Sequence, residues 1–533
     1  MSARWRRAGA AAAALAALLL IAAPAGAVTR TWAVTEWPSA GTSAPTAGAV
    51  SDAPVVSRTG RYVVFRSSAS NLVKGDTNSV PDVFLRDRLT RKLERVSVAT
   101  GGAQAGGASG APSVSADGRF VAFESSASNL IKGDANGRVD VFLRDRRAGT
   151  TTLVSRRADG GLTGQPGYQP SVSADGRYVA WATVGAMTPD DTNGVFDVYR
   201  RDLTRGATER VSVPRPGAMG NGASEHPVLS GDGTQVAFTS TASDLIWGDG
   251  NGHRDAFVRA MPGALTSLVS ISSAGIQGDG AVRGTVISAD AATVAFTSEA
   301  TNLVPGDTNR QPDVFVRERA SGTTRLVSAG LGGRPADAAS MTPAVSDDGR
   351  MVLFVSGARN LVEGDTDTPD AFVRDLQRAT TEKASQARDG SSANSVVRDA
   401  ALSGNGRYVA IATTSSNLVG TATGVRPEIL LAGPQVPFNT DPPSVTGTAI
   451  VRETLGADQG SWDNVPTGWA YQWQRCNADG EACRDIAKAT ASGYVPAQRD
   501  LGATLRVRVT AINAAGPSTA TSTATSPVVP PPS

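Results

Sequence analysis

The sequence predicts an all-β protein: a seven-bladed β-propeller with four-stranded blades, followed by a small β-sandwich. A turn of the type Ser-x-Asp-Gly-Arg, followed by alternating apolar residues, recurs seven times at steps of 57 or 58 residues. Each repeat holds four short segments rich in Val, Phe, Thr and Leu, bounded by Gly, Asp and Asn, which is typical of strands. A constant period indicates a repeat architecture, and seven four-stranded units fit a propeller.

The second repeat illustrates the expected strands. We predict them at residues 112–115, 119–124, 140–145 and 151–155, with an Asp-Gly hairpin turn between the first two. The anchor glycine of that turn, or the residue aligned with it, recurs at Gly60, Gly118, Gly176, Gly233, Ala291, Gly349 and Gly406.

The seventh repeat lacks its fourth strand, because its third ends at Leu431 and prolines follow at 434 and 437. Residues 29–35 have the pattern of a fourth strand and precede the first repeat. We therefore predict a ring closed by an N-terminal strand near residues 29–36, which leaves the last blade no open edge. A solenoid is the alternative architecture, but a solenoid gives no reason for the last unit to take its fourth strand from the N-terminal segment.

The repeated Ser-x-Asp-Gly-Arg-Tyr-Val-Ala-Phe pattern and the later Asp-Val-Phe-x-Arg-Asp segment resemble the TolB-like propeller repeats, relatives of WD-type repeats. The resemblance covers residues 30–432 and implies the fold. It implies little about activity, because such propellers serve as binding platforms, as gates on hydrolases and as lyases. The extra domain that precedes the TolB propeller has no counterpart here.

Residues 1–27 are expected to be a secretory signal, which makes the protein secreted. Arg4, Arg6 and Arg7 precede an apolar run over 8–23, and 25–27 read Ala-Gly-Ala, which predicts cleavage after Ala27. A membrane-spanning helix is the alternative, but the run is short for one. No second apolar stretch exists, so we expect no transmembrane anchor.

Removing residues 1–27 takes the formal charge from +2 to −1. A near-neutral chain gives no sign of a nucleic-acid partner. We expect a monomer.

The region after the propeller is predicted as a Pro-rich linker at 434–443, a β-sandwich at 444–525 and a Pro-rich tail at 526–533. Trp473 is the expected core tryptophan, and Val507 and Val509 face inward by strand alternation. Both cysteines, Cys476 and Cys483, lie here and are expected to form a local disulfide; a metal site is the alternative. The Tyr-x-Trp-x-Arg-Cys strand and the Asn-x-Ala-Gly hairpin resemble bacterial Ig-like domains of secreted actinobacterial proteins, which implies a spacer or adhesive module.

Acidic loops between strands two and three form a second recurrent motif, with oxygen-bearing residues at positions one, three and seven in repeats one to five. The sixth repeat is one residue tighter, and the seventh has lost the motif. This spacing resembles the start of a calcium loop, although no closing glutamate follows. The alternative is that these side chains cap turns. No cofactor is required, and calcium is the one candidate. The candidate ligands are Asp76, Asn78, Asp82, Asp134, Asn136, Asp140, Asp191, Asn193, Asp197, Asp249, Asn251, Asp255, Asp307, Asn309, Asp313, Asp365, Asp367 and Asp370.

Candidate catalytic groups are scarce, and we assign no catalytic residue. The chain has two histidines, His226 and His253, which by topology could meet near Asp249 and Asp255. No Gly-x-Ser-x-Gly nucleophile motif occurs. Six blades carry an arginine at the end of strand three, usually followed by an acid as in Arg86-Asp87, which indicates a structural ion pair.

The long loops after strands two and four crowd one face, where binding sites usually lie. The sequence thus favours a non-catalytic binding protein whose partner is a protein or a cell-surface glycan. A polysaccharide-active, lyase-like enzyme is the first alternative, and acids, arginine and tyrosine gathered in the channel would favour it. A calcium-stiffened structural spacer is the second alternative.

Overall fold

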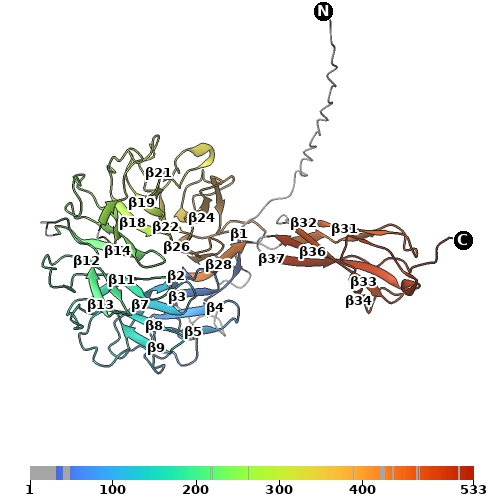
Figure 1. The fold of residues 1–533 in the computed structure, drawn as a ribbon, viewed down its shortest axis with the longest axis horizontal. Helices are drawn as coiled ribbons and strands as arrows, with labels where there is room; N and C mark the ends of the chain where they lie inside the picture. Colours follow the sequence, from blue (N-terminus) through green and yellow to red (C-terminus); the bar gives the residue numbers. More distant parts are fainter. Residues whose placement is uncertain are drawn as a thin grey trace, which may run out of the picture. The chain divides into compact units, whose positions relative to one another are not determined.

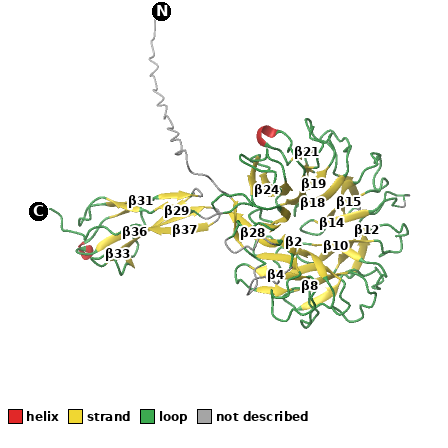
Figure 2. Cartoon of the chain, turned by 180° about the vertical axis from the view of Figure 1, so that it is seen from behind, coloured by secondary structure: helices red, strands yellow, loops and turns green. Residues whose placement is uncertain are grey.

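The structure is a computed structural model that describes residues 32–39, 49–216, 218, 220–261, 263, 265–387, 389–419, 426–434, 437–463, 466, 468–513 and 516–532. It divides into one compact unit of Arg30–Gln435 and another that includes Val436–Ser533. The predicted signal at 1–27 lies outside the described residues. Strands dominate both units (Figures 1 and 2).

The larger unit contains seven four-stranded antiparallel sheets among its described residues, which confirms the predicted propeller blades. Blade one comprises β2 (Ser51–Val56), β3 (Tyr62–Ser67), β4 (Asp82–Asp87) and β5 (Leu93–Arg95). Blade two comprises β6 (Ser109–Val114), β7 (Phe120–Ser125), β8 (Asp140–Asp145) and β9 (Thr150–Leu153). Blade three comprises β10 (Gly167–Val172), β11 (Tyr178–Thr183), β12 (Asp197–Asp202) and β13 (Ala207–Arg210). Blade four comprises β14 (Ser224–Leu229), β15 (Gln235–Ser240), β16 (Asp255–Ala260) and β17 (Leu265–Leu268). Blade five comprises β18 (Val282–Ile287), β19 (Thr293–Ser298), β20 (Asp313–Glu318) and β21 (Thr323–Leu326). Blade six comprises β22 (Ser340–Val345), β23 (Met351–Ser356), β24 (Asp370–Asp375) and β25 (Thr380–Lys383). Blade seven joins β26 (Val397–Leu402), β27 (Val409–Thr413) and β28 (Glu428–Pro434) to β1 (Trp32–Glu36), and the 3₁₀ helix η1 (Leu331–Gly333) lies between blades five and six.

The first strands of the blades form the inner circle of the ring. Each contacts the first strand of the next blade, from β2 through β6, β10, β14, β18 and β22 to β26, and β26 contacts β2 again. Figure 2 shows four of them, β2, β10, β14 and β18, gathered round a common centre.

The N-terminal strand β1 pairs antiparallel with β28 and is the outer strand of blade seven. Its other edge also has a partner, because the Val34 N–H donates to the Gln386 carbonyl of blade six at 2.8 Å. This is the pairing that a ring closed near residues 29–36 requires.

Aromatic pairs between strands two and three fill the blades. Phe123 and Phe142 in blade two, for example, stack at 5.9 Å between ring centroids and are fully buried. Trp181 and Tyr199 replace the phenylalanines in blade three, and Ile411 and Leu430 replace them in blade seven. Burying these large apolar side chains between neighbouring sheets stabilises the blades.

In blades one, two, three and six, strand three ends in an aspartate that pairs with the arginine of the anchor turn. In blade one, Arg61 donates two hydrogen bonds to Asp87, at 3.0 and 2.7 Å. The predicted pair is therefore structural, but its arginine is Arg61 instead of Arg86. Arg86 itself donates to the backbone carbonyls of Pro38 and Arg91.

These ion pairs predict acid sensitivity. The Arg61 guanidinium holds the pKa of Asp87 at about 2, and Arg177 does the same for Asp202. An aspartate in the unfolded chain has a pKa of about 3.9. The stability that the pair contributes is therefore complete above about pH 4 and is lost as the pH falls toward 2. In chemical denaturation between pH 5 and 2.5, the free energy of unfolding of Asp87→Asn should fall less with decreasing pH than that of the wild type. The exposed control Glu363→Gln should show the same fall as the wild type. If both variants show the wild-type fall, the assignment is contradicted.

The second unit is built from smaller sheets. The strands are β29 (Phe438–Asp441), β30 (Ser444–Thr446), β31 (Leu455–Asp458), β32 (Ser461–Asp463), β33 (Gly468–Cys476), β34 (Arg484–Asp485), β35 (Gly493–Tyr494), β36 (Thr504–Asn513) and β37 (Gly516–Thr521), with a 3₁₀ helix η2 (Gln498–Asp500). Trp473, Val507 and Val509 are fully buried, as predicted. The Ig-like assignment stays a prediction.

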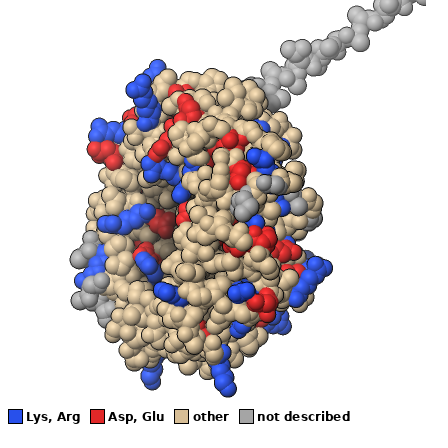
Figure 3. Space-filling model, turned by 90° about the vertical axis from the view of Figure 1, so that its left-hand side faces the viewer, with Lys and Arg blue, Asp and Glu red and all other residues tan. Residues whose placement is uncertain are grey.

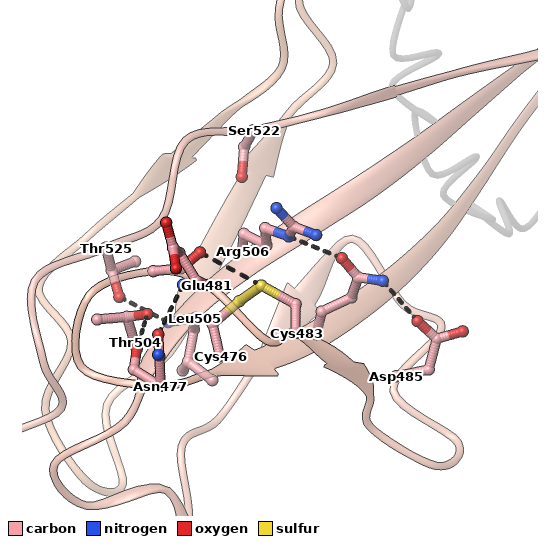
Figure 4. Close-up of a disulfide and its surroundings, with 12 residues drawn as sticks. Cys476, Asn477, Glu481, Cys483, Asp485, Thr504, Leu505, Arg506, Ser522 and Thr525 are labelled. Atoms are coloured by element: carbon pink, nitrogen blue, oxygen red, sulfur yellow. Dashed lines mark hydrogen bonds between the residues drawn. A yellow bond between two sulfur atoms is a disulfide. The ribbon is translucent and has the colours of Figure 1, made fainter.

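Cys476 and Cys483 form the predicted disulfide. It lies at the end of the β33–β36 pair, where the Thr504 hydroxyl donates to the Asn477 carbonyl at 2.8 Å (Figure 4). The bond therefore links the end of β33 to the segment that leads into β34.

Replacing Cys483 by serine should destabilise this unit by about 2–3 kcal/mol, because the open loop regains conformational entropy in the unfolded chain. Thermal unfolding should show one lowered transition in the variant and an unmoved propeller transition. Added reductant should lower the wild-type transition to the same temperature and leave the variant unchanged. A variant that unfolds like the oxidised wild type would contradict the prediction.

Candidate functional site

Each first strand of the propeller breaks its register once, near its start, at a β-bulge. In several blades the bulged residue has a positive φ although it is not glycine, as at Gln169 (57°) and His226 (55°). A bulge re-aims side chains and is common beside functional sites. Because the strands are antiparallel, the start of strand one lies at the same end as the loops after strands two and four.

Polar side chains of four blades interact at this end of the inner circle, where Arg66 of blade one acts electrostatically on Glu124 of blade two; we call this set the axial network. Arg66 binds Asp52 through two hydrogen bonds of 2.7 and 2.5 Å. The Glu124 carboxylate accepts the Gln169 N–H at 2.5 Å. The Gln169 side-chain oxygen in turn accepts the His226 N–H at 2.8 Å.

Further charges continue the network on both sides. The His226 Nδ1 lies 3.3 Å from the Thr239 hydroxyl. Arg254 pairs with Glu225 at 3.0 Å. On the other side, Asp399 of blade seven is close enough to Asp52 of blade one for their charges to repel. Acids, arginines and a histidine therefore lie together in the axial network.

Burial tunes the titration of this network. Desolvation raises the pKa of Asp399 to about 6, and repulsion by Asp52 adds to the rise. Desolvation also raises the pKa of Glu124 and lowers that of His226, which is therefore neutral at pH 7. A pKa of about 6 places the change in charge of Asp399 close to neutral pH.

Hydrogen bonds tie the acidic loops to their own backbone and to neighbouring side chains. The last aspartate of each motif, at position seven or, in blade six, position six, is at most 2% exposed. It accepts a hydrogen bond from a serine two residues after strand four in every blade that has the motif. In blade five, for example, the Asn309 amide nitrogen donates to Asp313 at 2.5 Å, while its oxygen accepts the Gln311 N–H at 2.8 Å. The same Asn–Asp hydrogen bond occurs in blades one to four, at Asn78–Asp82, Asn136–Asp140, Asn193–Asp197 and Asn251–Asp255.

The asparagine oxygens thus face backbone N–H groups, as in the capping alternative. Blade six differs, because Asp367 is exposed and pairs with Arg359 at 2.6 Å. Within the described residues, no three His, Cys, Asp or Glu side chains gather as a metal-binding group. Calcium stays a prediction for these loops.

Position-one aspartates are partly buried beside them. Burial raises the pKa of Asp76, Asp134, Asp249 and Asp307. Burial also raises the pKa of Asp255 and of Asp313 at position seven to about 6. Asp191 accepts a hydrogen bond from the Tyr199 hydroxyl, and Asp365 accepts one from Lys383.

The two histidines have different surroundings. His226 belongs to the axial network, whereas the His253 N–H donates to Asn251 and its ring acts on Asp255 only electrostatically. In the described part of the chain they share no hydrogen-bond partner, so the hypothesis of a histidine pair has no support in the contacts.

Trp247 is an exposed aromatic residue that the sequence analysis did not single out. It lies in the loop after β15 and is 76% exposed, and the Arg215 guanidinium lies over its ring at 3.7 Å. A large exposed aromatic side chain held in place is typical of a binding site. The signal was present in the repeat alignment, because the aligned positions hold Lys74, Lys132, Pro189, Pro305 and Glu363.

The surface drawn in Figure 3 carries Lys and Arg interspersed with Asp and Glu, without a large area of one sign. Among the described residues, no helix is long and apolar enough to cross a membrane.

No protein-family model matches the chain, and no curated protein matches it. Solved structures that are similar to it include β-propellers. A putative TolB from Agrobacterium tumefaciens is 16% identical, with a TM-score of 0.32, over 52% of this chain and 81% of that chain. An oligogalacturonate lyase in complex with manganese is 12% identical, with a TM-score of 0.45, over 76% and 99%, and a Dos1 propeller is 10% identical, with a TM-score of 0.39, over 76% and 95%.

Proposed function

We propose that this protein is an exported binding protein that holds a cell-surface glycan on the loop-rich face of its propeller. The observation that carries the proposal is Trp247, 76% exposed beneath the Arg215 guanidinium. Arg215 covers one face of the indole, so the rest of the ring is available for stacking against the C–H face of a sugar. The signal pattern at residues 1–27 supports export.

The axial network supports the same proposal. Its ion pairs leave much of their side chains in solvent, with 44% of Arg66 and 33% of Arg254 exposed. Hydroxyl-rich ligands are recognised by such charged donors and acceptors, placed around an aromatic platform. Glycans offer both the apolar face and the hydroxyl groups.

Replacing Trp247 by alanine should weaken glycan binding about tenfold or more, because the stacking surface is lost. The full mature chain would first be screened on a glycan array, and the best ligand titrated while tryptophan fluorescence is followed. Leu89→Ala is the matched control, since Leu89 is 75% exposed on the turn after strand three, at the opposite end of the blades. Equal binding by both variants, or capture of a protein and no glycan, would overturn the proposal.

A lyase-like or hydrolytic activity is a second candidate, favoured by one observation. Burial and the nearby Asp52 raise the pKa of Asp399 to about 6, so this carboxyl exchanges a proton close to neutral pH, as a general acid or base does. The sequence predicts that acids, arginine and tyrosine gathered together would favour an enzyme; within the described residues, the contacts of the axial network bring together the acids and arginines of that set but no tyrosine. Release of new sugar ends from the bound glycan by the wild type, but not by Asp399→Asn, would establish this function.

A further inference from the structure

Three of the six acidic loops contain their own cation, supplied by the last residue of strand four. In blade six, the Lys383 amine binds Asp365 and, at 2.8 Å, Asp370. In blade one, Arg95 lies 3.3 Å from Asp76 and 3.4 Å from Asp82. In blade three, Arg210 lies 3.8 Å from Asp191.

The other three loops have leucine at this position. Leu326 of blade five pairs with Phe315 in the same register in which Lys383 pairs with Phe372. Leu153 and Leu268 take the corresponding places in blades two and four. The acids are retained in these blades, but the charge that matches them on strand four is absent.

Blade five has the least compensation of the three. In blade two Arg156 attracts Asp140, and in blade four the Gln277 amide donates to Asp249 at 3.3 Å. In blade five the position of Gln277 is taken by Pro335, which has no side-chain donor.

The acids of blade five are also buried. Asp313 is fully buried and Asp307 is 7% exposed. One oxygen of Asp307, Oδ1, has no hydrogen-bond partner. The charged group that acts on Asp307 is a further acid, Asp279. A buried carboxylate pair of this kind is unfavourable unless a cation or a proton joins it.

We propose that the blade-five loop binds a calcium ion between Asp307 and Asp313, at the place that the Lys383 amine occupies in blade six. Leucine is shorter than lysine and carries no charge, so Leu326 supplies no amine to the two acids. The Gly306 carbonyl is a further ligand by register, because the aligned Gly75 carbonyl accepts Arg95 at 3.0 Å. Water completes the oxygen shell that calcium prefers.

Asn309 is not a ligand in this arrangement, since its oxygen is held by the Gln311 N–H. Two carboxylates and one carbonyl give a weak site, with a dissociation constant on the order of 10⁻⁴–10⁻³ M.

The test counts calcium ions bound per full-length chain by equilibrium dialysis at 5 mM calcium. Leu326→Lys supplies the blade-six cation to blade five and should remove one ion from the wild-type count. Lys383→Leu makes the reverse change and should add one ion. Leu326→Met is the matched control and should bind as many ions as the wild type.

Asp307→Asn provides a second variant in case Leu326→Lys does not fold, and it should also lose one ion. Calcium should raise the melting temperature of the wild type by about 1–2 °C, and that of Asp307→Asn by less. The proposal is overturned if the wild type retains no calcium, or if folded Leu326→Lys and Asp307→Asn bind as many ions as the wild type.

Discussion

Replacing Gly118 by alanine is expected to destabilise the propeller by about 2–4 kcal/mol. Gly118 has a φ of +71°, and a Cβ added there would lie 2.1 Å from Cδ2 of Tyr62 in the preceding blade. Tyr62 has little freedom to yield, because Arg61 and Arg146 lie over its ring at 4.8 and 4.7 Å. Backbone strain and a steric clash between blades therefore act together. Urea unfolding followed by circular dichroism measures the loss.

Gly133 provides the matched control, because it has a φ of +84° and nothing within 4 Å of its added Cβ. Alanine at Gly133 should cost only the backbone strain, about 1 kcal/mol. The difference between the two variants isolates the contact between the blades. If both lose the same stability, the anchor glycine serves its own turn alone and does not set the spacing of the blades.

The repeat could be predicted from the sequence because the same anchor residues make these contacts between blades and therefore recur at a fixed spacing. One blade departs from the pattern in a way that the structure explains. Ala291 replaces the anchor glycine with a φ of +59°, and the residue at the position of Tyr62 in the preceding blade is Gln235. A flexible glutamine can move aside where a stacked tyrosine cannot.

Strand one was predicted too short, and the axial network was missed for the same reason. In blade two the strand begins at Ser109, three residues before the predicted start at 112, because a bulge with Ala111 at a φ of 42° interrupts its pairing. Assigning side chains to the two faces of a strand by alternation assumes an unbroken pleat. Beyond a bulge the alternation no longer tells which face a side chain is on. Gln169 and His226 therefore could not be assigned to one site, although they are in contact.

The acidic loops show a different limit of sequence reasoning. The same spacing serves a metal ligand set and a capping network, and the loop sequence alone does not separate them. What distinguishes the blades is a residue outside the loop, Lys383 in one and Leu326 in another. Only the pairing of strand four with strand three shows that this residue faces the acids.

Replacing Trp32 by alanine is expected to cost about 3–5 kcal/mol, the largest effect of any single substitution proposed for this chain. Trp32 is 3% exposed and packs with Leu418 and Val397 of blade seven. Its carbonyl also accepts the Gln386 side-chain amide of blade six at 3.0 Å. Truncating the indole therefore weakens the strand that joins the chain start to the last blade. Chemical denaturation should show a lower midpoint, and limited proteolysis should cut blade seven first.

Trp247→Ala removes the same atoms from a residue that is 76% exposed, so it should change stability by no more than about 0.5 kcal/mol. Comparing Trp32→Ala with Trp247→Ala separates the effect of burial on stability from the effect of losing a tryptophan as such. If blade seven resists proteolysis in Trp32→Ala as well as in the wild type, β1 does not hold the last blade. A selective loss there means that the edge of β28 is left open, and an open edge of this kind is prone to pair with other chains. We therefore expect Trp32→Ala to aggregate on heating at temperatures at which Trp247→Ala remains in solution.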